Sequence, residues 1–339
     1  MSDFLDVDAT LEDWSTLRAA IDFKGLLVGN GASRVVWDDF GYDSLFENAR
    51  TVQDKPLSPS ELAVFDAMQT RSFEQVLGAL KTTSRVNKAL AVSSAAPRNR
   101  YYAIKEALIN SVHAIHIPWR RVQASTLATL NEELARYRTV FTTNYDLLNY
   151  WALQYRSEAI DDLFNSPNAS FDLSETATGK PRLLYLHGGL HLVRNQDGTA
   201  RKLTSTEGTL LGSFAINNTL KTLDDVPLFI NEGPSAEKLR TIRSSDYLSF
   251  CYEQLLGHGD SLCIFGHALG EQDAHIVRAL RLAKPATVAI SIYPRSAAFI
   301  QHQKRHYAKV FEGTGVALRF FDSKSHALGN PKLSVPVEV

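Results

Sequence analysis

The sequence predicts an α/β fold: a Rossmann-like, mainly parallel sheet with helices on both faces and a helical insertion after the first strand. Two observations predict it. Short apolar segments alternate with helical patterns through the second half of the chain, the order of elements that builds a parallel sheet. Four of the segments end in polar or glycine-containing tips, which suits strands whose carboxyl ends meet at one edge.

Composition excludes several classes of protein. The chain has 36 basic and 37 acidic residues among 339, so we expect no direct nucleic-acid binding and no attraction to an anionic membrane. The acidic N-terminus does not resemble a secretory signal, and no apolar run reaches the length of a membrane span, which predicts a cytoplasmic protein. The chain has two cysteines, Cys251 and Cys263, which is too few for a disulfide framework or a four-cysteine zinc site. Both lie in apolar patterns, where a free thiol behaves as a small hydrophobic side chain.

The first predicted strand, Gly25–Val28, runs into the turn Gly29-Asn30-Gly31-Ala32-Ser33. A short apolar strand before a glycine-rich turn is the phosphate-binding arrangement of dinucleotide folds. Glycines also serve tight turns with no ligand, so this turn alone leaves both interpretations open. The following residues, 34–46, lack periodicity and predict a loop over the site, with Trp37, Phe40 and Phe46 holding it to the core.

A helical insertion of about residues 50–137 is predicted between the first two strands, because apolar residues recur there at intervals of three and four. The segment 94–100 is predicted to break the pattern. His113 and His116 have the spacing of zinc ligands, but no third ligand is apparent nearby. We therefore predict that they are packing or surface residues.

The stretch Phe141–Asp146 reads as a strand that ends in a polar tip and leads into a helix. Asn144 and Asp146 would offer an amide and a carboxylate to one ligand at the carboxyl edge of the sheet. Either residue could instead cap the next helix, since both types do so readily.

The rest of the chain predicts further strands and helices. A strand at 182–186 ends in His187-Gly188-Gly189, and an Asp-Gly turn at 197–198 predicts a hairpin. The segment 227–230 is predicted as another inner strand. Further strands are predicted at 261–265, ending in the tip Gly266-His267-Ala268-Leu269, and at 287–292 and 316–321, and helices at 236–242, 247–256, 273–282 and 297–307. His191 is expected to pack in the core or lie at the surface, and Asp273 to cap a helix.

The four tips, in this order, resemble motifs of the sirtuin-like family of NAD-consuming proteins. The family's G-A-G-x-S turn is matched by Gly29, Gly31 and Ser33, and its T-Q-N-x-D strand end by Thr142 or Thr143, Asn144 and Asp146. Its H-G pair is matched by His187 and Gly188, and its G-T-S-L turn by Gly266 and Leu269. Asp39 and Phe40 resemble part of the family's P-D-F-R loop, although no arginine follows.

The resemblance implies a site for NAD+ as substrate. Catalytic roles would fall to Asn144, His187 and Asp146, and no metal is implied. The residues implied to bind the cofactor are Gly29, Asn30, Gly31, Ala32, Ser33, Asp39, Phe40, Thr143, Gly188, Gly266, His267 and Leu269.

Two departures narrow the implied function. Sirtuin deacylases carry a zinc ribbon of paired cysteines, which is missing here because no cysteine lies between His187 and Cys251. In addition, His267-Ala268 replaces both hydroxyl residues of the G-T-S-L turn. What remains resembles the bacterial branch that hydrolyses NAD+ to nicotinamide and ADP-ribose, several members of which are antiphage effectors. A non-catalytic NAD or ADP-ribose sensor and an ADP-ribosyltransferase remain alternatives. We expect one sirtuin-like domain over 1–339, with a second insertion at about 188–225, and regulation by self-association or a partner protein.

Overall fold

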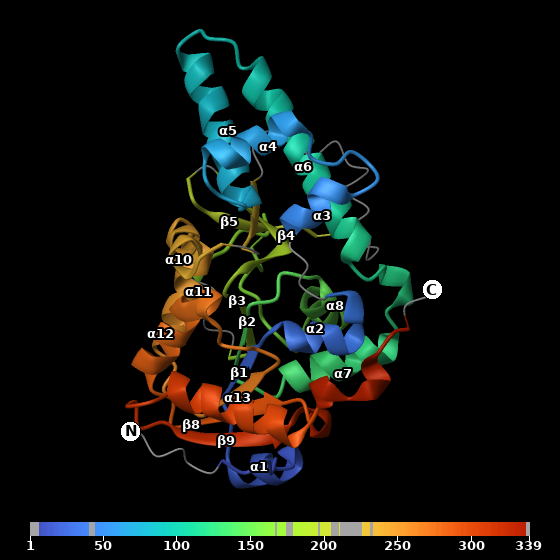
Figure 1. The fold of residues 1–339 in the computed structure, drawn as a ribbon, viewed down its shortest axis with the longest axis vertical. Coiled ribbons are helices and arrows are strands. Elements are labelled where there is room, and N and C mark those ends of the chain that lie inside the picture. The colour runs from blue at the N-terminus through green and yellow to red at the C-terminus, as the bar shows by residue number, and fades with distance from the viewer. Residues whose placement is uncertain are drawn as a thin grey trace.

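The computed structural model describes residues 7–40, 45–166, 168–173, 179–195, 197–204, 210, 226–230 and 233–336. Within these residues a six-stranded sheet has the order β3-β2-β1-β7-β8-β9, and all its neighbouring strands are parallel (Figure 1). Its strands are β1 (Gly25–Val28), β2 (Thr139–Thr142), β3 (Arg182–Tyr185), β7 (Leu262–Phe265), β8 (Thr287–Ile292) and β9 (Ala317–Asp322). The predicted Rossmann-like α/β class is confirmed.

The order of the strands reverses its direction of growth beside β1. From β1 the chain builds outward through β2 and β3, and then returns to the other side of β1 to build β7, β8 and β9. The direction of growth therefore reverses between β1 and β7. In open parallel sheets, ligands bind outside the carboxyl ends of the strands at such a reversal.

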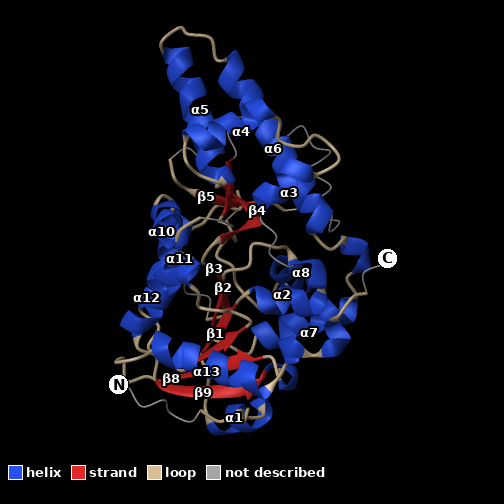
Figure 2. Cartoon of the chain, viewed as in Figure 1, coloured by secondary structure: helices blue, strands red, loops and turns tan. Residues whose placement is uncertain are grey.

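Helices cover both faces of this sheet (Figure 2). The helices α11 and α12 lie on one side, and α2, α7 and α8 lie on the other (Figures 1 and 2). No described helix combines the length and apolar content that a membrane span requires. The described α-helices are α1 (Trp14–Ala20), α2 (Asn30–Val36), α3 (Leu45–Thr51), α4 (Pro59–Ala67), α5 (Phe73–Ala89), α6 (Ala95–Ile115), α7 (Ala124–Leu134), α8 (Leu148–Tyr155), α10 (Ser235–Arg243), α11 (Asp246–Leu256), α12 (Ala274–Ala283) and α13 (Ala297–Val310).

Two predicted boundaries in the first half were wrong. The expected loop 34–46 includes the end of α2, the 3-10 turn η1 (Asp38–Phe40) and the start of α3, and its residues 41–44 lie outside the described part. The expected break at 94–100 is already helical from Ala95. Pro97 is tolerated there because it stands in the first turn of α6, where backbone N–H groups have no partner within the helix. Trp37, Phe40 and Phe46 are buried, as predicted.

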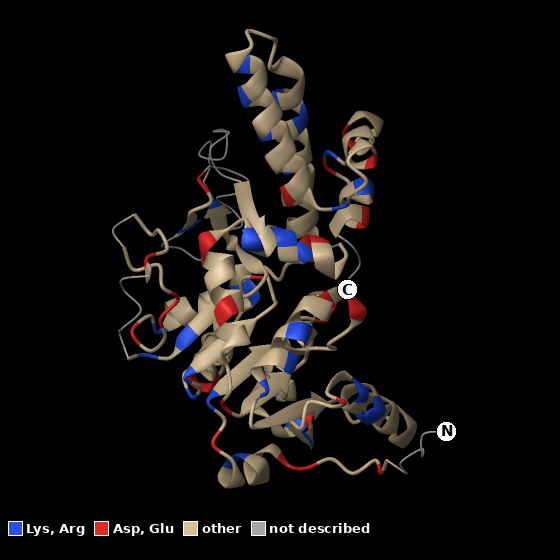
Figure 3. Ribbon diagram, turned by 90° about the vertical axis from the view of Figure 1, so that its left-hand side faces the viewer, with Lys and Arg blue, Asp and Glu red and all other residues tan. Residues whose placement is uncertain are grey.

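The helices α5 and α6 pair as a hairpin that projects from the body of the molecule (Figure 1). Figure 3 shows acidic and basic residues distributed along the ribbon, with basic residues prevailing on this hairpin. Near its base, α5 contacts a second sheet.

The second sheet is antiparallel. It consists, among the described residues, of β4 (Gly188–Arg194), β5 (Ala200–Lys202) and β6 (Val226–Phe229), in the order β5-β4-β6. The hairpin predicted from the Asp-Gly turn is present as β4 and β5. The prediction of 227–230 as an inner strand of the parallel sheet was wrong, because β6 pairs with β4 at an edge. Pro227 has no N–H to give an inner neighbour, so an edge suits this segment.

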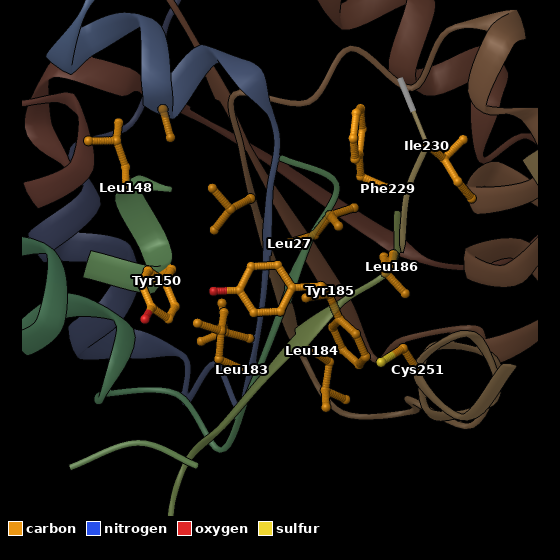
Figure 4. Packing of buried hydrophobic residues seen from close by; sticks show 14 of the residues in the cluster. Leu27, Leu148, Tyr150, Leu183, Leu184, Tyr185, Leu186, Phe229, Ile230 and Cys251 are labelled. Carbon is orange, nitrogen blue, oxygen red and sulfur yellow. The ribbon is translucent and has the colours of Figure 1, made fainter. Parts of the chain in front are cut away.

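The core lies between the main sheet and its covering helices. Leu27 of β1, Leu184 and Tyr185 of β3 and Cys251 of α11 all belong to this buried cluster (Figure 4). Burial raises the pKa of the Cys251 and Cys263 thiols, so both behave as small apolar side chains, as expected.

Candidate active site

The predicted tips of β1, β2, β3 and β7 meet at the carboxyl edge of the sheet. The backbone N–H of Gly29 donates to the carbonyl of Phe265 at 2.8 Å, and that of Gly31 donates to Gly266 at 2.9 Å. On the other side, Thr143 N–H donates to the carbonyl of Val28 at 3.1 Å. Parallel pairing thus brings residues more than two hundred positions apart to one place.

A cavity of about 580 Å³ opens at this edge. Its volume is within the range of small-molecule sites, roughly 300 to 1,000 Å³. Six of the residues predicted from sequence line it: Asn30, Gly31, Thr143, His187, Gly266 and His267. Arginine, lysine and aspartate side chains join them, namely Arg34, Arg71, Lys238 and Asp273. The cavity therefore offers both cations for an anionic ligand and histidines for proton transfer.

The glycine-rich turn proves to be the start of the seven-residue helix α2. Its glycines allow two turns to touch, since a Cβ on Gly31 would lie 2.6 Å from the Gly266 Cα and one on Gly29 would lie 2.6 Å from the Gly266 carbonyl oxygen. Three of the turn's N–H groups donate within the protein, those of Gly29, Gly31 and Ala32. These amides are occupied by the fold, so the nearby arginines are better placed than the turn to meet a phosphate.

Asn144 and Asp146 join Ser33 in a buried network behind the cavity wall. The amide Nδ2 of Asn144 donates to the Ser33 hydroxyl at 2.8 Å and to the Gly29 carbonyl at 3.1 Å. The Ser33 hydroxyl donates to Asp146 Oδ2 at 2.6 Å. Neither Asn144 nor Asp146 lines the cavity. The network therefore joins the tip of β2 to the start of α2.

Asp146 also performs the capping role that the sequence left open. Its Oδ1 accepts the backbone N–H of Leu148, the first residue of α8, at 2.9 Å. Burial raises the pKa of the Asp146 carboxyl, and the hydrogen bonds from Ser33 and Leu148 partly oppose that rise. By contrast, the Oδ1 of Asn144 is buried and has no protein hydrogen-bond partner. Buried polar atoms rarely lack a partner, so this oxygen is free to accept from a ligand or water.

His187 belongs to a group of titratable residues in and beside the cavity lining. Its Nε2 lies 2.8 Å from Nε2 of His275 and 4.0 Å from Oδ1 of Asp273. Lys238 donates to the same Asp273 oxygen at 2.9 Å, and His267 Nε2 lies 3.7 Å from Oδ2.

The charges of this group follow from burial and proximity. Burial lowers the pKa of His187 well below its usual value, with Asp273 opposing, so the imidazole is uncharged at neutral pH. Burial likewise lowers the pKa of His275, to about 4. Burial raises the pKa of the Asp273 carboxyl, but the Lys238 ammonium, which donates to it, helps to hold that pKa below its usual value.

Comparison with known proteins places the chain in a family. The model of DUF4917, described as a domain of unknown function, matches residues 26–328. The chain belongs to the DUF4917 family. No curated protein matches it. Among solved structures, a triple mutant of a Sir2 homologue in complex with 2'-O-acetyl ADP ribose is similar at 13% sequence identity, over 89% of this chain and 98% of that one, with a TM-score of 0.33. A TM-score this low does not establish a shared fold or function.

In this DUF4917 chain, other predicted residues lie away from the cavity wall. Asp39 is exposed in η1, and Phe40 is buried with its carbonyl accepting from Asn30 Nδ2 at 2.8 Å. Gly188, with φ +70°, would carry a Cβ 2.1 Å from the Leu228 carbonyl oxygen, so it serves the pairing of β4 with β6. Leu269 is buried in the left-handed region at φ +49° and donates its N–H to His267 Nδ1 at 3.0 Å.

The remaining histidines considered from the sequence either pack in the core or lie at the surface. His191 is fully buried and stacks on Tyr150. His116 is buried at the end of α6, with Nε2 accepting the N–H of Leu147 at 3.0 Å, and His113 is exposed. The expectation of packing or surface roles is confirmed for these three residues.

Several residues in and beside this cavity were not predicted from sequence. His275, Lys238 and Ser235 come from α10 and α12, and Arg71 comes from the segment before α5. His275 could have been found from the sequence. It lies two positions after Asp273 and among the apolar residues of the buried face of α12, where a histidine is unusual enough to indicate a role. Arg71 gave no local signal, since only the folding of the insertion brings it to the cavity.

Proposed function

We propose that this protein is an NAD+ glycohydrolase, which cleaves the bond between nicotinamide and ribose with water to give nicotinamide, ADP-ribose and a proton. The observation that carries the proposal is the convergence of His187, Thr143 and His267 on one cavity at the carboxyl edge of the parallel sheet. The resemblance to motifs of NAD-consuming proteins supports the proposal, because the matching residues lie at the strand tips that meet at this cavity.

His187 is the proposed general base. Its uncharged imidazole takes a proton from the attacking water while Nε2 remains within hydrogen-bond distance of His275. The Asp273 carboxylate, 4.0 Å away, stabilises the imidazolium that forms. A positioned base contributes about a hundredfold to ten-thousandfold in rate.

Asn144 is proposed to hold the ribose or the water through its unpartnered Oδ1. Departure of nicotinamide leaves positive charge at the ribose carbon, and an oriented amide oxygen favours that charge. Because Asn144 lies behind the wall, the tip of β2 must shift when NAD+ binds. Asp146 supports this arrangement through Ser33 and needs no contact with substrate.

The pyrophosphate is proposed to lie near Arg34 and Arg71. Both line the cavity, and their present partners are carboxylates, Asp38 at 2.9 Å and Glu47 at 3.6 Å. Guanidinium groups form paired hydrogen bonds with phosphate oxygens, so a bound ligand could displace these surface ion pairs.

The direct test follows nicotinamide and ADP-ribose release from NAD+ by the purified protein, with NAD+ binding measured in parallel. His187→Ala and Asn144→Ala are each expected to lower turnover at least a hundredfold while the protein stays folded. Asn131→Ala is a matched control, because Asn131 is equally buried and donates to the carbonyl of Ala152 at 2.9 Å, away from the cavity. The proposal is overturned if the protein neither turns over nor binds NAD+, or if both site variants keep the full rate.

A second function, an NAD- or ADP-ribose-binding sensor without catalysis, is favoured by the position of Asn144 off the cavity wall. Binding of NAD+ without release of nicotinamide would establish it. Transfer of ADP-ribose to a protein is distinguished by labelling of protein from NAD+ that carries a label in its adenosine half.

The motif resemblance also supports a role as a regulated antiphage effector. Unrestrained hydrolysis would exhaust a central cofactor, so self-association or a partner would control it, and the projecting α5–α6 hairpin is a candidate surface for that control. The measurement is NAD+ content and survival of phage-infected bacteria that express the wild-type protein or His187→Ala.

A further inference from the structure

The residues that surround the proposed base also have the composition of a metal site. His187 follows β3, Asp273 ends the short turn before α12, and His275 lies in the first turn of α12. Among the described residues, these three present one nitrogen or oxygen atom each, all within 4.8 Å of one another. The sequence motifs predicted no metal, and His275 was not among the predicted site residues.

The two imidazoles face each other through the atoms that bind metals. Their Nε2 atoms are 2.8 Å apart, so one proton at most can lie between them. The other nitrogen of His275, Nδ1, lies 3.0 Å from the Ser235 hydroxyl, and that hydroxyl accepts the backbone N–H of His275 at 2.7 Å. When Nδ1–H donates to Ser235, Nε2 presents its lone pair towards His187. Metal-binding histidines are usually oriented by an outer hydrogen bond of this kind.

Two histidines and one carboxylate form a donor set that Zn²⁺ accepts, with a fourth position left for water. Tetrahedral zinc, at about 2.0–2.1 Å from each nitrogen, sets the two nitrogens about 3.3 Å apart. The rings, whose Nε2 atoms now meet head-on, must therefore separate by about half an ångström and tilt until both lone pairs point at one ion. Lys238 opposes the cation, since its ammonium donates to Asp273 Oδ1 at 2.9 Å and must turn away. This competition argues for a site of moderate affinity.

We propose that His187, His275 and Asp273 bind a divalent transition metal, Zn²⁺ by preference, and that the bound metal inhibits the enzyme. The nitrogen of His187 that binds zinc is the one that faces His275, and a histidine that ligates a cation is no longer able to take a proton from water. The inhibition rests on the proposed NAD+ hydrolysis, whereas the metal site does not.

The site is tested first by binding alone. The full-length protein, freed of metal with a chelator, is titrated with Co²⁺ and followed by its visible absorption, and Zn²⁺ is then used to displace the cobalt. One ion per chain is expected, and His275→Ala is expected to raise the dissociation constant at least tenfold. His302→Ala, which removes an exposed histidine, is the control and is expected to bind as the wild type does.

Two further measurements keep the test decisive. His275→Gln retains side-chain volume if the alanine variant does not fold, and it is expected to weaken binding similarly. Anomalous diffraction from a zinc-soaked crystal is expected to place the ion between His187 and His275. Absence of stoichiometric binding, equal affinity in the folded His275 variants, or an ion located elsewhere overturns the site.

The inhibitory consequence has a separate measurement. Zinc is expected to suppress nicotinamide release at concentrations near its dissociation constant, the chelator is expected to restore it, and the His275 variants are expected to lose this sensitivity whatever their own rate. Stoichiometric zinc without any NAD+ turnover would overturn the proposed function and leave the site standing. Turnover that zinc does not change, in protein shown to bind it, would overturn the inhibition.

Discussion

The Ser33 hydroxyl donates to Asp146 Oδ2 at 2.6 Å and ties the first turn of α2 to the tip of β2. Because Asp146 is buried, loss of this bond leaves a carboxyl group with less compensation for its lost hydration. Ser33→Ala is expected to lower the free energy of unfolding by roughly 1–3 kcal/mol, measured by urea denaturation.

Ser33→Ala is also expected to reduce NAD+ turnover, because Asn144 loses one of its two anchors. Ser111→Ala is the matched control. Ser111 is fully buried in α6 and donates to the carbonyl of Leu45 at 3.1 Å, so its loss should cost about 1 kcal/mol and leave turnover unchanged. Equal effects of the two variants on turnover would contradict a positioning role for Ser33.

Gly31→Ala is expected to destabilise the protein by roughly 1–3 kcal/mol and to weaken NAD+ binding. Its added methyl would meet the backbone of Gly266 at 2.6 Å, which cannot move aside as a flexible side chain could. Gly259→Ala, where nothing lies within 4 Å, should change stability by no more than about 0.5 kcal/mol. Thermal unfolding and NAD+ titration of both variants make the comparison.

Acid is expected to destabilise the fold through His116. Burial lowers its pKa to about 4, and its Nε2 can accept the Leu147 N–H only while unprotonated. The unfolded chain takes up a proton below about pH 6.5, so the stabilisation is complete above that pH and is lost progressively down to about pH 4. Between pH 7 and pH 5 this residue should contribute a loss of roughly 2 kcal/mol.

Urea denaturation at the two pH values checks this expectation. His116→Gln, which cannot be protonated, is expected to show a smaller loss of stability than the wild type. His302→Gln, at an exposed position, should show the wild-type loss. A wild-type pH dependence in His116→Gln would assign the acid sensitivity to other groups.

Arg71→Ala is expected to raise the KM for NAD+ by about tenfold or more with little change in kcat, because a charged contact to phosphate is made equally in substrate and transition state. Arg85→Ala on α5 is the control, as Arg85 is exposed and does not line the cavity. Steady-state kinetics of nicotinamide release measures both. A fall in kcat at constant KM would place Arg71 in a different role.

The strands could be predicted closely because each is a short apolar run that ends at a glycine or polar residue. The strand β1 has the predicted bounds Gly25–Val28, and β8 has the predicted bounds Thr287–Ile292. The prediction for segment 227–230 was wrong because an apolar run alone does not show which sheet a strand joins. Pro227 indicated an edge strand, since an inner strand must donate its N–H groups and proline has none.

The site could be predicted only in part. Its strand tips are local in sequence, so Thr143, His187 and His267 could be named in advance and do line the cavity. Arg71 could not be named in advance, because it reaches the cavity only through the packing of a long insertion. Asn144 illustrates a third case: the residue type and location at the strand tip were predicted, but its burial depends on Ser33 and on the close approach of two glycine turns.

The parallel pairing of β1 with β7 joins Gly25 to Leu262 and Val28 to Phe265. During translation the glycine turn therefore leaves the ribosome long before the strand that completes its surroundings. A nascent chain that ends before β7 has neither Gly266 nor His267 nor Asp273, and it therefore lacks part of the lining of the cavity. Pairing of such distant segments is also slow to form. The cavity lining is therefore completed only after the chain has been made as far as Asp273, so formation of the site must wait for most of the chain.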